Sequence, residues 1–215
     1  MQCMDITEKT AILRKFSIFG SLSDQAFLDV GSKTHEIAID EGKVFIRQGD
    51  TVGPIYFIYN GLAKIYRLNE NGMVANLGFA GEFEIVGDMA FITSQNRSAS
   101  VEAMRKVDAL VLSPEDFKNI LYAYPEISIQ LMQIFSQRLR KSNASSEEMM
   151  FQNLTHRTWI ALETLSKYFP EKSITLSHEE LAEIVGATRA RTTEALHQLQ
   201  KEKKIQLSHR NIHIL

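Results

Sequence analysis

The chain has 215 residues, of which 44% are hydrophobic and 23% charged, and its formal net charge is −2. This composition is ordinary for a globular protein of one or two domains and argues against a disordered chain. No run approaches the roughly 20 apolar residues that cross a bilayer, and the N-terminus lacks a signal-peptide pattern, so we expect a cytoplasmic protein with no membrane partner. The single cysteine, Cys3, can form no internal disulfide and cannot by itself hold an iron–sulfur cluster.

A short amphipathic helix is predicted near the N-terminus, with Ser23 as its capping residue. Residues 34–112 then alternate between apolar and polar side chains, and turn residues interrupt them about every ten positions. Strands are predicted at 34–39, 43–47, 55–59, 62–68, 73–79, 98–103 and 107–112. The pairs Asn60-Gly61 and Asn71-Gly72 predict tight hairpins between them. Many short strands without long intervening helices favour a sandwich, jelly roll or barrel.

Two helices are predicted to follow the β region. Ser113 and Pro114 give a strong helix start, and Pro125 opens a helix that we expect to run through residue 151. Its first half carries a seam of apolar residues at spacings of three and four: Ile127, Leu131, Ile134, Phe135 and Leu139. Such a seam is typical of a coiled coil, and the polar run 141–148 continues the helix beyond one compact core. We therefore predict a homodimer joined by this helix; the alternative is a core helix packed on its own β domain.

The C-terminal region contains the pattern of a helix-turn-helix. Ser177 and Glu180 form a capping box at the start of one helix. Gly186 permits a turn, and Thr188 can cap a second helix. An unrelated helical hairpin is the alternative interpretation. The residues predicted to contact DNA are Ser177, Thr188, Arg189, Ala190, Arg191, Thr193, Glu194 and His197.

Arg189 is the strongest candidate for base recognition, because a guanidinium can make a bidentate contact to guanine, while Thr188 suits a phosphate. Residues 205–207 and 211–215 then predict a small β-hairpin or wing. From residue 156 onward nine basic side chains stand against seven acidic ones, which is weak support for a nucleic-acid-binding end. For four further basic side chains, contact with DNA phosphates and simple exposure to solvent are equally good interpretations: Lys201, Lys203, Lys204 and Arg210.

The order of β-barrel, long helix and winged helix-turn-helix resembles the CRP/FNR family, which includes the cyclic-AMP receptor protein. The stretches 41–50 and 55–61 look like barrel turns of that family, and 87–91 followed by 96–99 resembles its phosphate-binding cassette. The resemblance covers nearly the whole chain. It implies an α+β protein with an N-terminal antiparallel β jelly-roll domain and dimerisation helix at 1–152, and a winged helix-turn-helix at 153–215.

The resemblance also implies an effector site. In the cyclic-AMP-binding members a glycine-glutamate pair binds the ribose, an arginine-serine pair the cyclic phosphate, and a threonine-serine pair the adenine. By position these roles fall on Gly87, Asp88, Arg97, Ser98, Ser142 and Asn143. Asp88 is one methylene shorter than the family's glutamate, and Ser142 and Asn143 depart from the adenine pair. An arginine beside a serine suits a phosphate on physical grounds. A structural ion pair of Arg97 is the alternative.

The sequence lacks the residues that several other functional classes require. Residues 37–155 contain neither His nor Cys, so we expect no haem, no metal and no iron–sulfur cluster, and a metal-dependent cupin enzyme has no ligands there. We predict a non-enzymatic transcription regulator that binds a palindromic site on double-stranded DNA, with RNA polymerase as a partner. Its expected effector is a small phosphate-bearing molecule such as a cyclic nucleotide. The alternative is a regulator of the same family that responds to another effector or is active without ligand.

Overall fold

A computed structural model describes residues 4–208 and 211–215, with the side chains of 145–151 excepted. Cys3 and Arg210 lie outside the described residues. The chain divides into two compact units, Met1–Arg67 with Leu77–Leu139, and Leu68–Asn76 with Arg140–Leu215. This division falls inside the long helix, whereas the sequence placed a domain boundary after residue 152.

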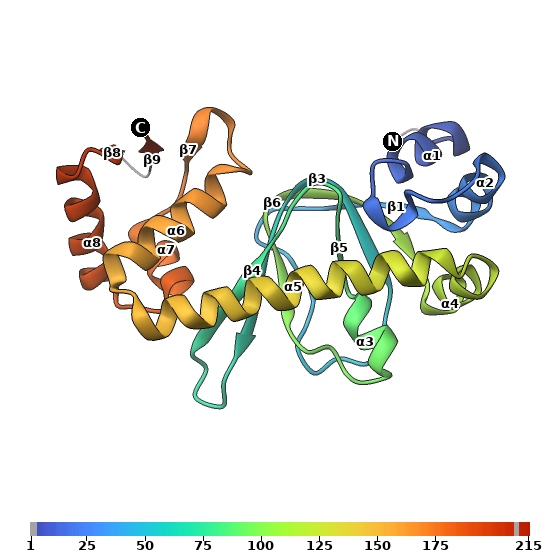
Figure 1. The fold of residues 1–215 in the computed structure, drawn as a ribbon, viewed down its shortest axis with the longest axis horizontal. Helices are drawn as coiled ribbons and strands as arrows, with labels where there is room; N and C mark the ends of the chain where they lie inside the picture. Colours follow the sequence, from blue (N-terminus) through green and yellow to red (C-terminus); the bar gives the residue numbers. More distant parts are fainter. Residues whose placement is uncertain (1–3, 209–210) are drawn as a thin grey trace. The chain divides into compact units, whose positions relative to one another are not determined.

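The first unit is built on an antiparallel sheet flanked by helices (Figure 1). Its strands are β1 (His35–Ile39), β2 (Val44–Ile46), β3 (Ile55–Leu68), β4 (Val74–Ala80), β5 (Glu84–Val86) and β6 (Ser100–Leu112), with the end of β3 and the start of β4, within Leu68–Asn76, grouped with the second unit. The order in the sheet is β1-β6-β3-β4, with β2 paired to β6 and β5 to β3. Its helices are α1 (Ile6–Leu13), η1 (Ser17–Phe19), α2 (Asp24–Lys33), α3 (Asp88–Thr93), α4 (Pro114–Ala123) and α5 (Glu126–Phe151), of which α5 continues into the second unit. The predicted β domain and its following helices are confirmed.

Two predicted pairs of strands, 55–59 with 62–68 and 98–103 with 107–112, are single strands in the structure, β3 and β6 respectively. β3 runs through Asn60 and Gly61 without a hairpin, and its register against β6 shifts there. Gly61 has φ +102°, and a Cβ at this position would lie 2.1 Å from the carbonyl oxygen of Lys106. The glycine therefore permits an irregularity within β3, and the predicted hairpin at this pair is wrong. By contrast, the amide of Gly72 donates to the carbonyl of Asn69 in a turn that joins β3 to β4.

The core of the first unit surrounds Phe57 on β3. The rings of Phe16, Phe19 and Phe117 lie with centroids 5.6, 5.3 and 6.3 Å from that of Phe57. All four side chains are buried, so the helices before and after the sheet share one core.

The first half of α5 packs on this same core. Ile127 and Leu131 are 0% and 4% exposed and belong to the core cluster, while Ile134 and Phe135 are half-buried against it. All four were predicted to form a dimer seam. Ile127 and Leu131 are covered by the protomer itself, so the assignment is corrected for these two, whereas it stays a prediction for the half-buried Ile134 and Phe135. Leu139, in contrast, is 63% exposed.

The second unit contains α6 (Leu154–Ser166), η2 (Pro170–Lys172), β7 (Ser173–Ile174), α7 (His178–Val185), α8 (Arg189–Lys201), β8 (Ile205–Ser208) and β9 (Asn211–Ile214). Its three-stranded sheet has the order β7-β9-β8. β8 and β9 pair antiparallel from Ile205 opposite Ile214 to Ser208 opposite Asn211. The predicted helical pair and hairpin are therefore both present.

Candidate functional site

The start of α7 is fixed by its capping box. The hydroxyl of Ser177 accepts from the amide of Glu180 at 3.1 Å, and the Glu180 carboxylate accepts from the amide of Ser177 at 2.7 Å. α7 ends at Gly186, which has φ +66° with no atom within 4 Å of a Cβ built there. Backbone conformation rather than space therefore favours glycine at this turn. The hydroxyl of Thr188 then accepts from the amide of Arg191 at 3.4 Å and begins α8.

The inward faces of α7 and α8 are apolar and buried. Leu181 and Ala182 on α7 are 0% and 2% exposed, and Leu196 on α8 is 0% exposed. Thr192 is also buried, and its hydroxyl donates to the carbonyl of Thr188 at 3.0 Å, so it brings no unsatisfied polar group into the interface. The opposite face of α8 is consequently turned to solvent.

The structure places five of the predicted DNA-contacting side chains on that exposed face of α8: Arg189, Ala190, Arg191, Glu194 and His197. Thr193 differs from them. It is half-buried, and its Oγ1 lies 2.9 Å from Nδ1 of His178 on α7. Sequence reasoning did not assign His178, since nothing local in the sequence shows that it meets a residue of the next helix.

A pocket of about 480 Å³ opens beside this histidine. It is lined by Leu176, Ser177, His178, Glu179, Arg189, Ser208, Asn211 and Ile212, which come from the starts of α7 and α8 and from the hairpin. The pKa of His178 is lowered, first by burial and then by the positive charges of Arg189 and His197. The lining of the pocket therefore contains a guanidinium, a titratable imidazole, two hydroxyls and a single carboxylate.

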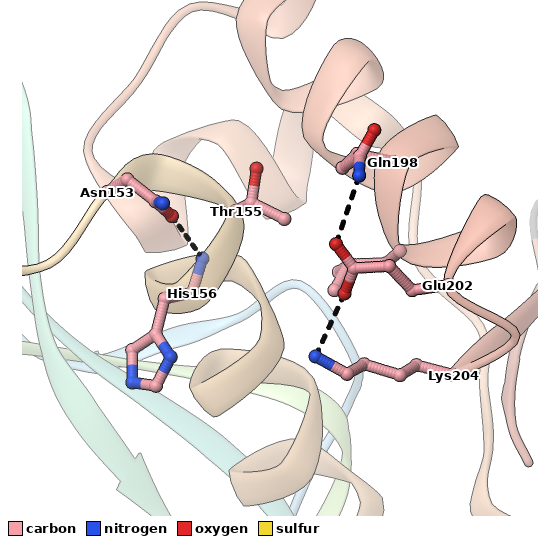
Figure 2. Close-up of a pocket in the computed structure, with 7 residues that line it drawn as sticks. Asn153, Thr155, His156, Gln198, Glu202 and Lys204 are labelled. Atoms are coloured by element: carbon pink, nitrogen blue, oxygen red, sulfur yellow. Dashed lines mark hydrogen bonds and ion pairs between the residues drawn. The ribbon is translucent and has the colours of Figure 1, made fainter.

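A second pocket of the same unit, of about 280 Å³, has a different charge balance (Figure 2). At one side Glu202 accepts from Nε2 of Gln198 at 3.0 Å and from Nζ of Lys204 at 2.9 Å. These two contacts, that of Lys204 first, lower the pKa of Glu202. Lys204 also lies 5.5 Å from the ring centre of Trp159. Because its charge is matched by a carboxylate, Lys204 is a weaker candidate for a phosphate contact than the sequence indicated.

In the first unit, Gly87 and Arg97 are brought together. Nη1 of Arg97 donates to the carbonyl of Gly87 at 2.6 Å, and Nη2 donates to the carbonyl of Pro54 at 2.7 Å. Gly87 has φ +90°, and a Cβ there would lie 2.7 Å from Nη1 of Arg97. Arg97 is only 5% exposed, and burial lowers its pKa. The guanidinium thus holds two backbone segments together.

Asp88, the neighbour of Gly87, is 2% exposed and is paired with an arginine from α5. Nη1 of Arg138 donates to Oδ2 of Asp88 at 2.7 Å, and its Nη2 donates to the carbonyl of Ile85 at 2.6 Å. Burial raises the pKa of Asp88, and the charge of Arg138 opposes that shift. Sequence reasoning missed Arg138. Its only signal was a position seven residues after Leu131, on the helix face that packs against the core.

The remaining predicted effector residues are exposed. Ser98 follows Arg97, and Ser142 and Asn143 lie on the part of α5 that belongs to the second unit. In the part of the chain that the structure describes, no three His, Cys, Asp or Glu side chains are grouped so that they could hold a metal ion. Among the same residues, no helix is both long enough and apolar enough to cross a membrane.

Comparison with known proteins identifies both units. The family model described as cyclic nucleotide-binding domain matches residues 36–124, and that of the Crp-like helix-turn-helix domain matches 154–215. The cyclic AMP receptor protein of Thermus thermophilus is 26% identical over 167 residues, which cover 78% of this chain and 77% of that protein. A CRP-like cAMP-activated global transcriptional regulator of Mycobacterium tuberculosis is 24% identical over 192 residues, 86% of each chain.

Solved structures show the same fold. The c-di-GMP responsive global regulator CLP of Xanthomonas campestris has a TM-score of 0.76 at 21% identity, over 89% of this chain and 99% of that one. A regulator of the CRP/FNR family from Eubacterium rectale has a TM-score of 0.75 at 18% identity, over 93% and 94% of the two chains. A sensor-type β domain, a long helix and a Crp-like helix-turn-helix in this order place the chain in the CRP/FNR family of transcription regulators.

Proposed function

We propose that the chain acts as a homodimer that binds a palindromic DNA operator through the exposed face of α8. The observation that carries this proposal is the set of exposed side chains at the start of α8, beside a pocket that contains Arg189 and His178. Side chains at the N-terminal end of a recognition helix are those that reach base edges in the major groove. On the family resemblance alone, we expect RNA polymerase as a further partner.

Selection of binding sites from random DNA tests the symmetry of the operator. A dimer with two equivalent α8 helices is expected to enrich inverted half-sites whose centres lie about 10 base pairs apart, because the two helices enter successive major grooves. Electrophoretic mobility then gives the stoichiometry of the complex. Enrichment of a single asymmetric half-site bound by one protomer would contradict the proposal.

A dimer face that shares only Leu139 with the predicted seam is available on α5. Ile129, Met132 and Leu139 are 56%, 60% and 63% exposed. Their spacings of three and seven residues bring them to one side of the helix, opposite the face that Ile127 and Leu131 bury in the core. We propose this exposed stripe as the seam between two protomers.

For the effector, we propose a phosphate-bearing molecule that binds at Arg97. The match to the cyclic nucleotide-binding domain and the names of the relatives support this. Two of the five N–H donors of the guanidinium go to the carbonyls of Gly87 and Pro54, so a phosphate would bind the remaining donors or displace these carbonyls, with Ser98 as a second donor. A regulator that responds to another effector, or to none, is the second candidate, and the burial of Arg97 and its two backbone hydrogen bonds favour it, since they give the guanidinium a structural role within the protomer.

Replacing Arg97 with Leu distinguishes these candidates. If a cyclic nucleotide binds, the variant is expected to lose about a hundredfold in affinity, because a charge-assisted contact to the phosphate is removed. The free energy of unfolding is also expected to fall by about 1 to 3 kcal/mol, because two backbone carbonyls lose their donors. Calorimetry with cyclic AMP and cyclic GMP, together with thermal melts, measures both effects.

The exposed Arg67 provides a matched control, since Arg67→Leu removes the same charge without removing these contacts. Equal affinities of the parent and the Arg97 variant for a cyclic nucleotide would show that Arg97 holds no phosphate. Failure of the parent to bind any cyclic nucleotide at millimolar concentration would leave a regulator that responds to another effector, or to none, as the supported function.

A further inference from the structure

His178 connects the two helices of the DNA-binding motif. It is the first residue of α7, and its Nδ1 lies 2.9 Å from Oγ1 of Thr193 in the second turn of α8. Both side chains are half-buried, so water competes only in part for this hydrogen bond. The hydrogen bond therefore helps to set the orientation in which α8 presents its exposed face.

His178 also lines the pocket of about 480 Å³, and its contact with Thr193 uses only one of its two ring nitrogens, Nδ1. From α8, the charged or titratable groups that act on the imidazole are Arg189 and His197. From α7, Glu179 lines the same pocket, and the described residues of the hairpin contribute the uncharged Ser208 and Asn211. The lining thus has one carboxylate, one guanidinium and the His178 imidazole, so a proton on His178 gives it a net positive charge that suits an anion.

We propose that His178 takes up a proton when DNA binds, with Nε2 donating to a phosphodiester of the DNA backbone while Nδ1 keeps its contact with Thr193. This inference rests on the proposed operator binding by α8. It adds a positioning residue that also contacts the backbone, and it makes operator affinity depend on pH.

The contact with Thr193 is compatible with both protonation states. A hydroxyl can donate to a neutral Nδ1 and can accept from a protonated one, so a proton on the ring changes the direction of the hydrogen bond but not the partners. Protonation therefore does not separate α7 from α8. It only adds a positive charge and ensures a donor at Nε2, which strengthens the hydrogen bond to a phosphate.

The sign of the pH dependence follows from the charges. In the free protein, burial and the charges of Arg189 and His197 lower the pKa of His178, so the ring is mostly neutral at neutral pH. A phosphate in the pocket favours the charged ring and raises that pKa in the complex. Binding then takes up protons, and affinity is highest below the pKa of the free protein and declines as pH rises through the pKa of the complex.

The test is fluorescence anisotropy with a labelled duplex selected from random DNA, between pH 6 and pH 8.5 at constant ionic strength, because salt alone changes such affinities. The parent is expected to bind at least about tenfold more tightly at pH 6 than at pH 8. The number of protons taken up on binding should not exceed one per protomer. The variant His178→Asn keeps an amide where Nδ1 lies but cannot titrate. It is expected to show a clearly flatter profile, with weaker binding at low pH.

Two further variants make the result specific. His197→Asn removes the neighbouring exposed imidazole and measures its separate share of the pH dependence. His178→Gln places an amide nitrogen near the position of Nε2 and is expected to bind more tightly than His178→Asn at high pH, again with a flatter profile. Thermal melts confirm that each variant is folded.

Specific binding with the same pH profile in the parent and in His178→Asn would overturn the inference and leave the proposed function intact. Absence of sequence-specific binding by the parent at every pH would overturn the proposed function itself, and the inference with it.

Discussion

Replacing Arg189 with Ala is expected to abolish most sequence-specific DNA binding. A bidentate arginine–guanine contact contributes about 1 to 3 kcal/mol of discrimination, and a dimer makes it once in each half-site. The expected loss on the operator is therefore about 2 to 6 kcal/mol, from roughly thirtyfold to more than ten-thousandfold. Arg189 is exposed at the first position of α8, so the protomer loses no buried contact. Anisotropy titrations with operator and scrambled duplexes measure the ratio of the two affinities.

Lys201→Ala is the matched control for this experiment. It removes one positive charge from the last turn of the same helix, at an exposed position. We expect it to change the affinities for operator and scrambled DNA by similar small factors, because a phosphate contact carries no sequence information. If Arg189→Ala discriminates the operator from scrambled DNA as well as the parent does, Arg189 is not a base reader.

The family resemblance affects which operator is expected. Ala190 stands where many members carry a glutamate that reads the half-site, and here it is exposed with no group that can reach a base edge by hydrogen bonding. Glu194, one turn later on the same exposed face, can accept from the amino group of cytosine. The half-site of other members is therefore not expected to apply to this chain.

The DNA-binding motif could be predicted from the sequence because its determinants are local. The capping box at Ser177 needs only Glu180, three residues later, and the turn needs only the φ of Gly186. The contact between His178 and Thr193 could not be predicted in this way, since it depends on the angle at which two helices pack.

The barrel shows why local turn signals are not sufficient. Asn60-Gly61 has the composition of a tight hairpin, yet the chain continues in β3 because β6 pairs along both halves of the strand. Gly61 serves close packing against Lys106 instead of a reversal of the chain. The same residue pair thus suits two structures, and strand pairing over some fifty residues of sequence decides between them.

The long helix shows a similar ambiguity. A heptad-like stripe on α5 predicts a buried face, but the pattern is the same whether the cover is the protomer's own core or a second protomer. Ile127 and Leu131 are covered by the protomer, and Arg138 on the same face pairs with Asp88. The sequence pattern did not separate Leu139 from this buried face, nor did it show that Leu139 and Met132 lie on a second, exposed stripe.

Replacing Met132 and Leu139 together with Glu is expected to convert the dimer to monomers. Both side chains are at least 60% exposed in the protomer, so the fold should be retained. In a dimer seam, four carboxylates would be brought together away from water, where burial and mutual repulsion both oppose association. A monomer reaches only one half-site and loses the gain from linked binding, so operator affinity should fall at least about a hundredfold. Sedimentation velocity and thermal melts measure mass and folding.

The control lies on the same helix. Gln137 is exposed two residues before Leu139, and about 200° around the helix axis from it at 3.6 residues per turn. Gln137→Glu adds a carboxylate outside the proposed seam and is expected to leave the dimer intact, whereas Leu139→Glu alone should weaken it. A double variant that remains dimeric at the concentrations where the parent is a dimer would place the seam elsewhere. In that case the half-site spacing of the selected operator, and not α5, would have to guide the search for the interface.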